Sequence, residues 1–297
     1  MSRLRALAAL AALVVAVGLV AIIPGTPASA AACTASWQAS TVYWGGDQAS
    51  RGGRNYQAKW WTQGEAPPGS TGVWQDLGAC GGGTTPPPTN PGGFVVSEAQ
   101  FNQMFPGRNS FYTYSGLVAA LGAYPAFART GSVTVQRQEA AAFLANTYHE
   151  TGGLVHIVEQ NTANYPHYCD PGQPYGCPAG QSAYYGRGPI QLSWNFNYNA
   201  AGNALGLPLL TNPWLVQNDA SVAWKTAIWY WMTQNGPGTM TAHNAMVTGA
   251  GFGQTIRSIN GSIECNGGNP AQVQSRVTRY QQFVGILGVP AGANLSC

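Results

Sequence analysis

A run of glycine, threonine and proline over residues 81–93, Gly-Gly-Gly-Thr-Thr-Pro-Pro-Pro-Thr-Asn-Pro-Gly-Gly, divides this chain into two parts. The run offers no hydrophobic side chain to a core, because its glycines favour flexibility and its prolines favour an extended backbone. A segment of residues 31–80 precedes it, and a much longer segment of residues 94–297 follows it. The sequence therefore predicts a small domain, a linker over 81–93 and one large domain.

The first 30 residues have the pattern of a secretory signal peptide. Arg3 and Arg5 precede an apolar run, and Ala28-Ser29-Ala30 supplies the small residues of a cleavage site. A signal anchor is the alternative, but the small-residue site favours cleavage near Ala30. No later stretch is long and apolar enough to span a bilayer. We therefore expect a secreted, extracellular protein without membrane contact after cleavage.

Charge and composition favour a neutral, polar substrate. Without Arg3 and Arg5 the formal net charge of +3 falls to +1, and no basic stripe occurs along the chain. A nucleic-acid partner is therefore not expected. The low charged fraction of 8% and the many Gly, Asn, Gln, Tyr and Trp residues suit an exported protein that acts on a sugar polymer.

The six cysteines fit an oxidising compartment. Their positions favour three pairs, which are Cys33 with Cys80, Cys169 with Cys177, and Cys265 with Cys297. The first pair brackets the small domain, the second closes a short loop and the third ties down the C-terminus. Because no Cys-x-x-Cys is present and the four histidines lack ligand spacing, we predict no metal site and no cofactor.

The small domain is rich in aromatic residues for its size. Residues 33–80 contain short strand-like runs and Gly-rich turns, too few to bury a large core, so a disulfide staple is expected. Its densest run ends in Trp60-Trp61, while Tyr43 and Trp74 lie elsewhere. Because neighbours on a strand point to opposite faces, a regular strand would bury one of these two tryptophans and expose the other.

The run Ala58-Lys59-Trp60-Trp61, together with the terminal cysteines, resembles the chitin- and cellulose-binding modules of carbohydrate-binding families 5 and 12. The resemblance implies that exposed aromatic rings stack on sugar rings, and it makes both Trp60 and Trp61 candidate chitin ligands. A β-bulge would reconcile two exposed neighbours with a strand. Tyr43 or Trp74 is the alternative platform.

Helical signals dominate from Phe94 onward. Ser97 and Gln100 form a capping box ahead of a first helix that Pro106 ends, and Asn269 caps a last helix with Pro270 at its first position. Hydrophobic spacing predicts further helices over 111–123, 134–150, 195–205, 219–234, 241–248 and 252–260. The aromatic run over 224–232 is expected to form a buried core helix. Residues 160–189 form a long loop suited to lining a cleft, so this domain is predicted to be mainly α-helical.

Two acids stand out, because only seven acidic residues occur from Glu98 onward. The helix over 134–150, with Thr134 as its expected N-cap, ends before Gly152, which puts Glu150 in its last turn. There the helix dipole and burial both favour a protonated carboxyl, which suits a general acid. Glu159 lies in the following loop, where it can stay ionised and act as a base. The alternative is that both are ordinary surface acids.

A zinc-protease helix is excluded by spacing. His149-Glu150 would need a second histidine four residues after the first, and Gly153 occupies that position.

Residues 94–297 resemble the family 19 chitinases. The motifs that carry the resemblance are His149-Glu-Thr-Gly-Gly153, the stretch from Tyr184 to Tyr198, and Ile259-Asn-Gly261 followed by Glu264-Cys265. Together with the small domain they resemble the secreted streptomycete enzymes of this family. The resemblance implies a mainly α, bilobed, lysozyme-like catalytic domain, preceded by a small all-β carbohydrate-binding module held by a disulfide.

The resemblance also assigns residues. It implies that Glu150 is the general acid, that Glu159 is the general base and that Ser193 helps to hold the attacking water. The positions that match polar cleft residues of the family are Gln191, Asn197, Asn260, Tyr184 and Lys225, and those that match an ionic network near the acid are Arg276 and Glu264.

The activity implied is endo-acting, inverting hydrolysis of β-1,4 bonds between N-acetylglucosamine units of chitin. Inversion needs the two carboxyls roughly 6.5–9.5 Å apart, which leaves room for water. We expect chitin and its oligosaccharides as partners, a monomeric protein and an antifungal role. A peptidoglycan hydrolase of lysozyme-like fold and a non-catalytic chitin-binding lectin are the alternatives, and the presence of Glu150, Glu159 and Ser193 argues against the lectin.

Overall fold

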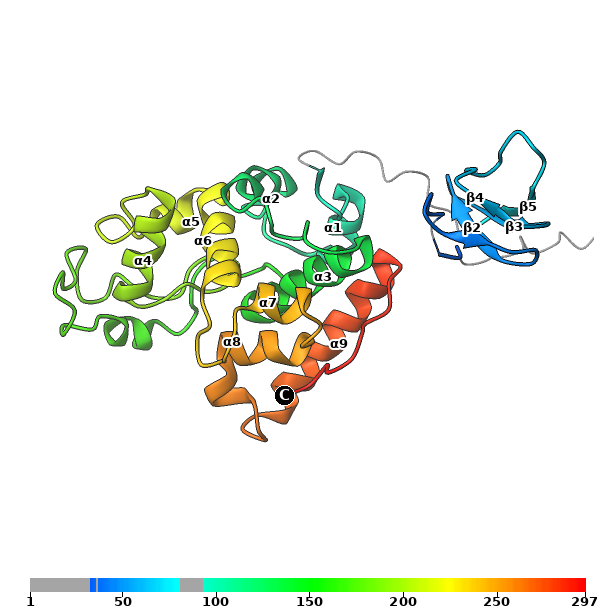
Figure 1. Cartoon of the computed structure of the whole chain (residues 1–297). Coiled ribbons are helices and arrows are strands. Elements are labelled where there is room, and N and C mark those ends of the chain that lie inside the picture. The colour runs from blue at the N-terminus through cyan, green and yellow to red at the C-terminus, as the bar shows by residue number, and fades with distance from the viewer. Residues whose placement is uncertain (1–32, 36, 81–92) are drawn as a thin grey trace, which may run out of the picture. The chain divides into compact units, whose positions relative to one another are not determined.

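A computed structural model describes residues 33–35, 37–80 and 93–297, which fall into two compact units (Figure 1). The predicted signal peptide and nearly all of the predicted linker lie outside the described residues. Within the described ranges, no helix has the length and apolar character needed to cross a membrane.

The small unit is built from short antiparallel strands. They are β1 (Val42–Tyr43), β2 (Gln48–Arg51), β3 (Arg54–Ala58), β4 (Thr62–Gln63) and β5 (Trp74–Ala79). β1 pairs with β4, and β2, β3 and β5 form a sheet in that order. Side chains of these strands, together with Val73 just before β5, fill one core, whose members are Tyr43, Ala49, Tyr56, Ala58, Val73 and Trp74. The Cys33–Cys80 disulfide closes the unit, so the predicted disulfide-stapled β module is confirmed.

Trp60 and Trp61 lie in the turn between β3 and β4, since β3 already ends at Ala58. Their side chains are 53% and 52% exposed. The expectation that one of them is buried is therefore wrong, because strand alternation does not apply to residues in a turn. Tyr43 and Trp74 are buried and pack edge to face in the core, with ring centroids 5.2 Å apart, so neither can be the alternative platform.

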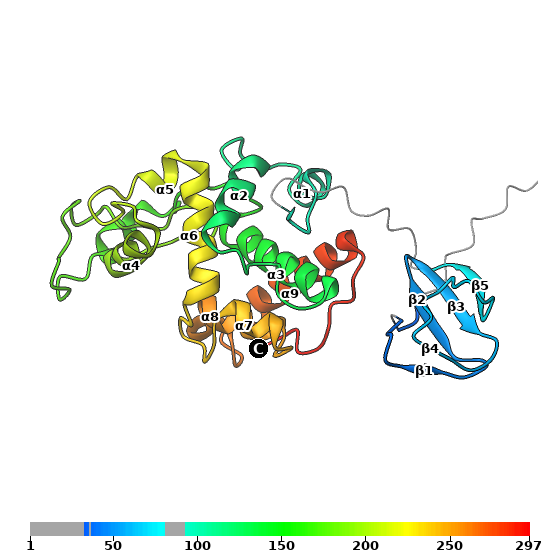
Figure 2. The same cartoon turned by 45° about the horizontal axis from the view of Figure 1, so that its top comes forward.

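The large unit is helical. Its elements are α1 (Glu98–Met104), α2 (Tyr114–Ala120), η2 (Leu121–Ala123), α3 (Val133–Thr151), η3 (Thr162–Tyr168), α4 (Asn195–Leu205), α5 (Leu215–Asn218), α6 (Ala220–Thr233), α7 (Ala242–Val247), α8 (Phe252–Glu264) and α9 (Pro270–Leu287). α3 packs along α9, as Figure 2 shows, and also contacts α7 and α8, while α6 contacts α2, α4, α5 and α7.

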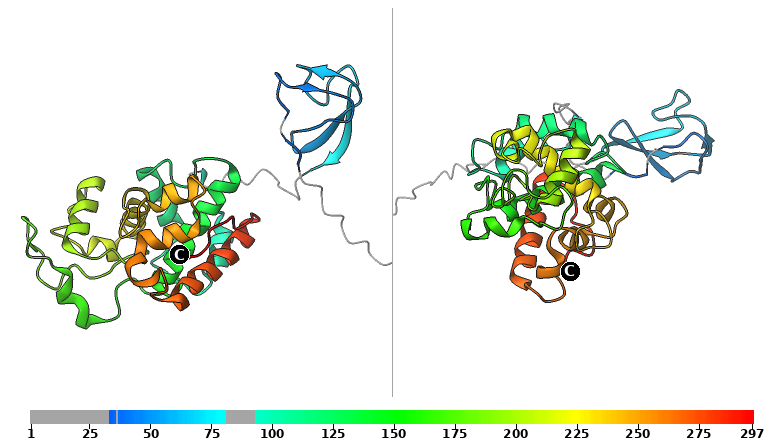
Figure 3. Two further views of the ribbon diagram at one scale, coloured as in Figure 1. Left: turned by 60° about the horizontal axis from the view of Figure 1, so that its bottom comes forward. Right: turned by 90° about the vertical axis from the view of Figure 1, so that its left-hand side faces the viewer.

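These contacts divide the large unit into two lobes. One contains α3, α7, α8 and α9, and the other contains α4, α5 and the long loop that follows α3, with α6 running between them (Figures 1 and 3). The predicted bilobed, mainly α architecture is thus confirmed.

The core of the large unit is formed around α3 and α6. Residues 139–147 of α3 are all buried, so this helix is enclosed on every side. From α6, the Trp224 ring packs against Phe101, Tyr112 and Phe143, with centroids 5.9–6.2 Å apart. The aromatic run over 224–232 is therefore a core helix, as predicted.

Local signals located most helix ends correctly. The Ser97–Gln100 capping box is present, and Asn269 caps α9 with Pro270 at its start. α3 is capped by Ser132 rather than by Thr134, because the Ser132 hydroxyl accepts from the Val135 amide. The helix predicted over 111–123 is shorter, since Thr113 caps α2 and residues 121–123 form a 3₁₀ turn.

The disulfides follow the predicted pairing. Cys169–Cys177 closes the loop after η3, and Cys265–Cys297 joins the end of α8 to the C-terminus.

Candidate active site

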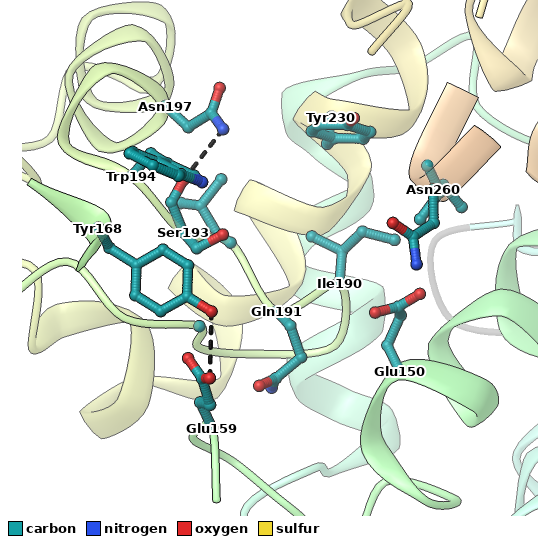
Figure 4. A pocket seen from close by; sticks show the side chains of 13 residues that line it. Glu150, Glu159, Tyr168, Ile190, Gln191, Ser193, Trp194, Asn197, Tyr230 and Asn260 are labelled. Atoms are coloured by element: carbon teal, nitrogen blue, oxygen red, sulfur yellow. Dashed lines mark hydrogen bonds between the residues drawn. The ribbon is translucent and has the colours of Figure 1, made fainter. Parts of the chain in front are cut away.

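A cavity of about 430 Å³ lies where the two lobes of the large unit meet. Its wall takes Glu150 from α3, Asn197 from α4, Tyr230 from α6 and Asn260 from α8. The remaining wall residues come from η3 and the loops around it, namely Glu159, Tyr168, Gly186, Ile190, Gln191, Leu192, Ser193 and Trp194, with Ile259 from α8. Figure 4 shows that Glu150 and Glu159 reach the cavity from different elements, with Gln191 between them.

Glu150 lies in the last turn of α3, as the sequence predicts. Gly152 follows as a left-handed C-cap with φ of 62°, a conformation that glycine adopts without strain. The Glu150 side chain is 18% exposed, and its Oε1 accepts a hydrogen bond of 2.5 Å from Nη2 of Arg276.

Arg276 connects this carboxyl to a second acid. Its Nε and Nη2 donate to the two carboxylate oxygens of Glu264 at 2.8 and 2.7 Å, and its Nη1 donates to Asn146 at 3.1 Å. Asn260 adds a hydrogen bond of 2.8 Å to Glu264. Arg276 and Glu264 are 1% and 0% exposed, so they contact Glu150 from the protein interior and cannot contact a ligand in the cavity. The ionic network expected near the acid is therefore present.

The pKa values of two titratable groups are shifted here, Glu264 within the Arg276 network and His149 beside it. Burial raises the pKa of Glu264, but the hydrogen bonds and charge of Arg276, together with Asn260, outweigh burial and bring that pKa below its ordinary 4.5. Burial and the Arg276 charge lower the pKa of His149 below its ordinary 6.5. At neutral pH Glu264 is thus ionised and His149 is neutral.

Glu159 is held by neutral donors from η3. Its Oε1 accepts from Nδ2 of Asn164 at 2.8 Å and from the hydroxyl of Tyr168 at 3.1 Å. Burial, with the hydrogen bond and charge of Glu159, raises the pKa of Tyr168 to about 12, so this hydroxyl keeps its proton. The other carboxylate oxygen, Oε2, is buried and has no hydrogen-bond partner among the described residues. One oxygen is therefore fixed, and the other can still accept a hydrogen bond.

Backbone hydrogen bonds connect Glu159 to the loop before α4 and stabilise that loop. The amide of Glu159 donates to the Gly186 carbonyl at 2.9 Å, and Arg187 and Leu192 exchange two backbone hydrogen bonds. A Cβ at Gly186 would lie 2.9 Å from Oε1 of Gln191, so glycine leaves room for the Gln191 side chain in its present position. Ser193 follows directly on the same turn.

The structure brings four of the predicted polar cleft residues to the cavity, namely Gln191, Ser193, Asn197 and Asn260. Two others are elsewhere. Tyr184 is fully buried, and its hydroxyl donates to the Leu210 carbonyl and accepts from the Ala179 amide, so its expected place in the cleft is wrong. Lys225 is half-buried on α6 and does not line the cavity, so its expected place in the cleft is wrong too.

The sequence did not predict three aromatic residues of the cavity wall, which are Tyr168, Trp194 and Tyr230. Tyr230 donates to the Ser258 carbonyl at 2.9 Å, and burial, with the charge of Glu150, raises its pKa to about 12. It belongs to the aromatic run of α6, whose hydrophobic pattern indicates only core. Trp194 belongs to the family-like stretch, but nothing in its spacing indicates which way its ring points.

The small unit carries an aromatic surface of its own, formed by Trp44, Trp60 and Trp61. Trp44 is 63% exposed, and the amide of Gly46 donates to the Ala58 carbonyl, which brings the Trp44 turn beside the end of β3. Trp44 was not singled out from the sequence. No signal in the sequence indicates its exposure, because it follows the last residue of β1 and strand alternation does not apply there.

Two family models match the sequence. The class I chitinase model, which describes glycoside hydrolase family 19, matches residues 95–297, and that of carbohydrate-binding module family 5/12 matches residues 36–75.

Individual relatives agree with these matches. Chitinase 3 of Oryza sativa subsp. japonica is 40% identical over 259 residues, which cover 75% of this chain and 80% of the relative. The crystal structure of chitinase C from Streptomyces griseus HUT6037 is 67% identical, with a TM-score of 0.72, and covers 89% of this chain and 100% of that chain. A family 19, class IV chitinase from Zea mays is 44% identical, with a TM-score of 0.61, over 68% of this chain and 98% of that one.

Proposed function

The chain belongs to the class I chitinases, glycoside hydrolase family 19, and we propose that it hydrolyses the β-1,4 bonds between N-acetylglucosamine units inside chitin chains. The observation that carries the proposal is a single cavity lined by two carboxyls in contrasting surroundings. Glu150 and Glu264 both accept hydrogen bonds from the Arg276 guanidinium, whereas Glu159 accepts hydrogen bonds from neutral groups.

Glu150 is the proton donor in this proposal. Two carboxyls, Glu150 and Glu264, contact the one cation of Arg276, and Glu264 takes two of its hydrogen bonds. Since Glu264 is ionised and balances the guanidinium, a proton on Glu150 leaves the group of three neutral. The glycosidic oxygen takes this proton as its bond to the sugar breaks.

Glu159 is the base. Its Oε1 is fixed by Asn164 and Tyr168, and Oε2 is the oxygen left to accept the proton of a water molecule. The water attacks the anomeric carbon on the face opposite the leaving oxygen, and Ser193 and Gln191 on the adjacent turn help to orient it. One displacement of this kind inverts the anomeric configuration and needs the two carboxyls roughly 6.5–9.5 Å apart. Both proton transfers use carboxyl groups, so the reaction proposed needs no cofactor.

The rest of the chain suits an insoluble substrate outside the cell. We propose a signal peptide over residues 1–30, a chitin-binding module over 31–80, a linker over 81–93 and the catalytic domain over 94–297. The exposed rings of Trp44, Trp60 and Trp61 would stack on chitin. A secreted monomer with this activity would also attack the chitin of fungal walls.

Glu150→Gln and Glu159→Gln test the two roles. Each amide keeps the shape of its carboxyl, so we expect turnover of a soluble chitin oligomer to fall by at least about a hundredfold, with oligomer binding and melting temperature retained. Near-parental turnover by Glu150→Gln would show that Glu150 is not the general acid.

Stereochemistry and substrate class are tested on the parent protein. Proton NMR of fresh product should show the α-anomer before mutarotation, and initial β-product would exclude inversion. Reducing-sugar release from chitin and from bacterial cell walls, measured side by side, should occur on chitin. Release from walls alone would indicate a peptidoglycan hydrolase, and release from neither would indicate a lectin.

A further inference from the structure

The short helix η3 holds Glu159 at three points. Asn164 and Tyr168 donate to its carboxylate, and the hydroxyl of Tyr165 donates to its backbone carbonyl at 2.9 Å. No residue of η3 is fully buried, and among them only Tyr168 packs, half-buried, against the core of the unit. This leaves η3 in need of a further anchor, because the direction of the Glu159 carboxylate depends on it.

A stack of three planar groups supplies that anchor. The ring of Tyr165 lies on the ring of Tyr185, with centroids 3.7 Å apart and planes 11° from parallel. The guanidinium carbon of Arg187 lies 3.6 Å from the centroid of the same Tyr185 ring. The Tyr185 hydroxyl and Nε of Arg187 both donate to Oε1 of Gln217, at 3.1 and 2.6 Å, which fixes the two groups to each other.

Arg187 is an unusual residue to find here. It is fully buried, and no carboxylate pairs with it among the described residues. Its Nη1 donates instead to the carbonyls of Ala183 and Tyr185 and to the hydroxyl of Tyr198. A buried cation without a counter-ion is costly, and the face of an aromatic ring is one of the few neutral groups that attract it. A gain in stability alone is therefore a poor explanation for this arginine.

We propose that Arg187 is a positioning residue for Glu159 that acts through the Tyr185 and Tyr165 rings. The inference rests on the proposed role of Glu159 as the base. The guanidinium orients Tyr185, Tyr185 holds Tyr165, and Tyr165 keeps η3 where Asn164 and Tyr168 can fix Oε1. Without the stack, η3 keeps the packing of Tyr168 against the core and Trp194, a hydrogen bond from Gln181 to the Pro166 carbonyl, and the Cys169–Cys177 disulfide that follows it.

The matched variants are Tyr185→Leu and Tyr185→Phe. Leucine removes the ring on which both neighbours stack, whereas phenylalanine keeps the ring and loses only the hydrogen bond to Gln217. For Tyr185→Leu we expect kcat on a soluble chitin oligomer to fall roughly 10- to 100-fold, because an error of about 1 Å in a catalytic group has that effect. KM should stay near the parental value, and Tyr185→Phe should retain parental kcat within about threefold.

Arg187→Lys and Arg187→Met test whether the planar guanidinium of Arg187 orients the Tyr185 ring. Lysine keeps the charge but loses the planar group, so both variants should lower kcat in the same direction as Tyr185→Leu. Because a substitution at a fully buried arginine can prevent folding, melting temperatures are measured throughout, and the Tyr185 pair keeps the proposal falsifiable by itself.

A double-mutant cycle separates positioning from general damage. In a Glu159→Gln background the base is already lost, so adding Tyr185→Leu should change the residual rate by no more than about twofold. An equal loss of rate in both backgrounds, or parental kcat in Tyr185→Leu alone, would overturn the positioning role. Parental turnover by Glu159→Gln alone would instead overturn the proposed base, so the two failures are distinguishable.

Discussion

Arg276 is the single residue on which the setting of Glu150 most depends. Its guanidinium bonds Glu150, Glu264 and Asn146, which belong to α3 and α8, while Arg276 itself lies on α9. One side chain therefore joins three helices and also sets the charge beside the proposed acid.

For Arg276→Ala we expect a lower rate, because Glu150 loses the guanidinium that fixes its carboxyl. Stability should also fall by about 3–5 kcal/mol, because Glu264 is left buried without its partner. Turnover assays and thermal melts on the same sample measure both effects.

Arg279→Ala is the control on the same helix. Arg279 stacks on Tyr148 and bonds Gln282, away from the cavity, so its loss should leave turnover unchanged. If Arg276→Ala lost stability but kept parental turnover, Arg276 would only anchor α9.

The same cluster predicts how stability depends on pH. The folded-state pKa of Glu264 lies below 4.5, so the stability that its ionised form contributes is present above pH 4.5 and is lost as the pH falls through the folded value. The folded-state pKa of His149 lies below 6.5, so as the pH falls below 6.5 the unfolded chain takes up the proton first, which favours unfolding.

The melting temperature should therefore decline from pH 6.5 downward and decline further below pH 4.5. His149→Gln removes the first group, and its melting temperature should change less between pH 6.5 and 4.5 than that of the parent. Parallel curves for the two proteins in that interval would rule out His149 as the source.

At the scale of elements, α8 and the C-terminal segment depend on close backbone contact. Gly253, in the first turn of α8, donates its amide to the Asn294 carbonyl at 2.8 Å. A Cβ at Gly253 would lie 2.1 Å from the carbonyl oxygen of Ser296, which is backbone and cannot rotate away. Gly251 permits the same approach, since a Cβ there would lie 2.6 Å from the Ala293 carbonyl oxygen.

Gly253→Ala should therefore displace the C-terminal segment and destabilise the protein by about 1–3 kcal/mol, the usual effect of overpacking. Gly285→Ala on α9 is the matched control, since Gly285 is exposed and a Cβ there meets nothing within 4 Å. Because alanine has the higher helix propensity, the control should be stabilised by about 0.5–1 kcal/mol. Equal melting temperatures for the two variants would contradict this account.

At the scale of the whole molecule, chitin binding and hydrolysis are assigned to different units. The aromatic surface of Trp44, Trp60 and Trp61 belongs to the small unit, and the cavity belongs to the large one. Loss of one function should therefore leave the other intact.

Replacing Trp60 and Trp61 together with alanine should weaken adsorption to insoluble chitin by about fivefold or more, taking for each lost ring contact the ~0.5–1.5 kcal/mol that aromatic pairs contribute. Turnover of a short soluble oligomer should stay at the parental level. Leu77→Ala is the control, since Leu77 is an exposed apolar residue of the same unit, on β5. Parental adsorption by the double variant would leave Trp44 as the main contact.

The sequence by itself determined the features that depend on neighbours along the chain. The Ser97 capping box, the Gly152 cap that ends α3 and the place of Glu150 in its last turn all follow from residues within about four positions of each other. Motif order indicated the family, and the cysteine positions indicated the three disulfides. Such signals are readable because local hydrogen bonds and covalent links need no knowledge of the packed core.

Only the tertiary structure decided which distant side chains meet and which way they point. Arg276 reaches Glu150 across 126 positions, and Tyr165, Tyr185 and Arg187 stack although nothing in their spacing requires it. Tyr184 lies in the core, although its position in the family motif suggested the cleft. Trp60 and Trp61 are both exposed, although strand alternation suggested that one of them is buried. These outcomes depend on how whole helices and loops pack, because burial of a side chain is decided by segments remote in the sequence.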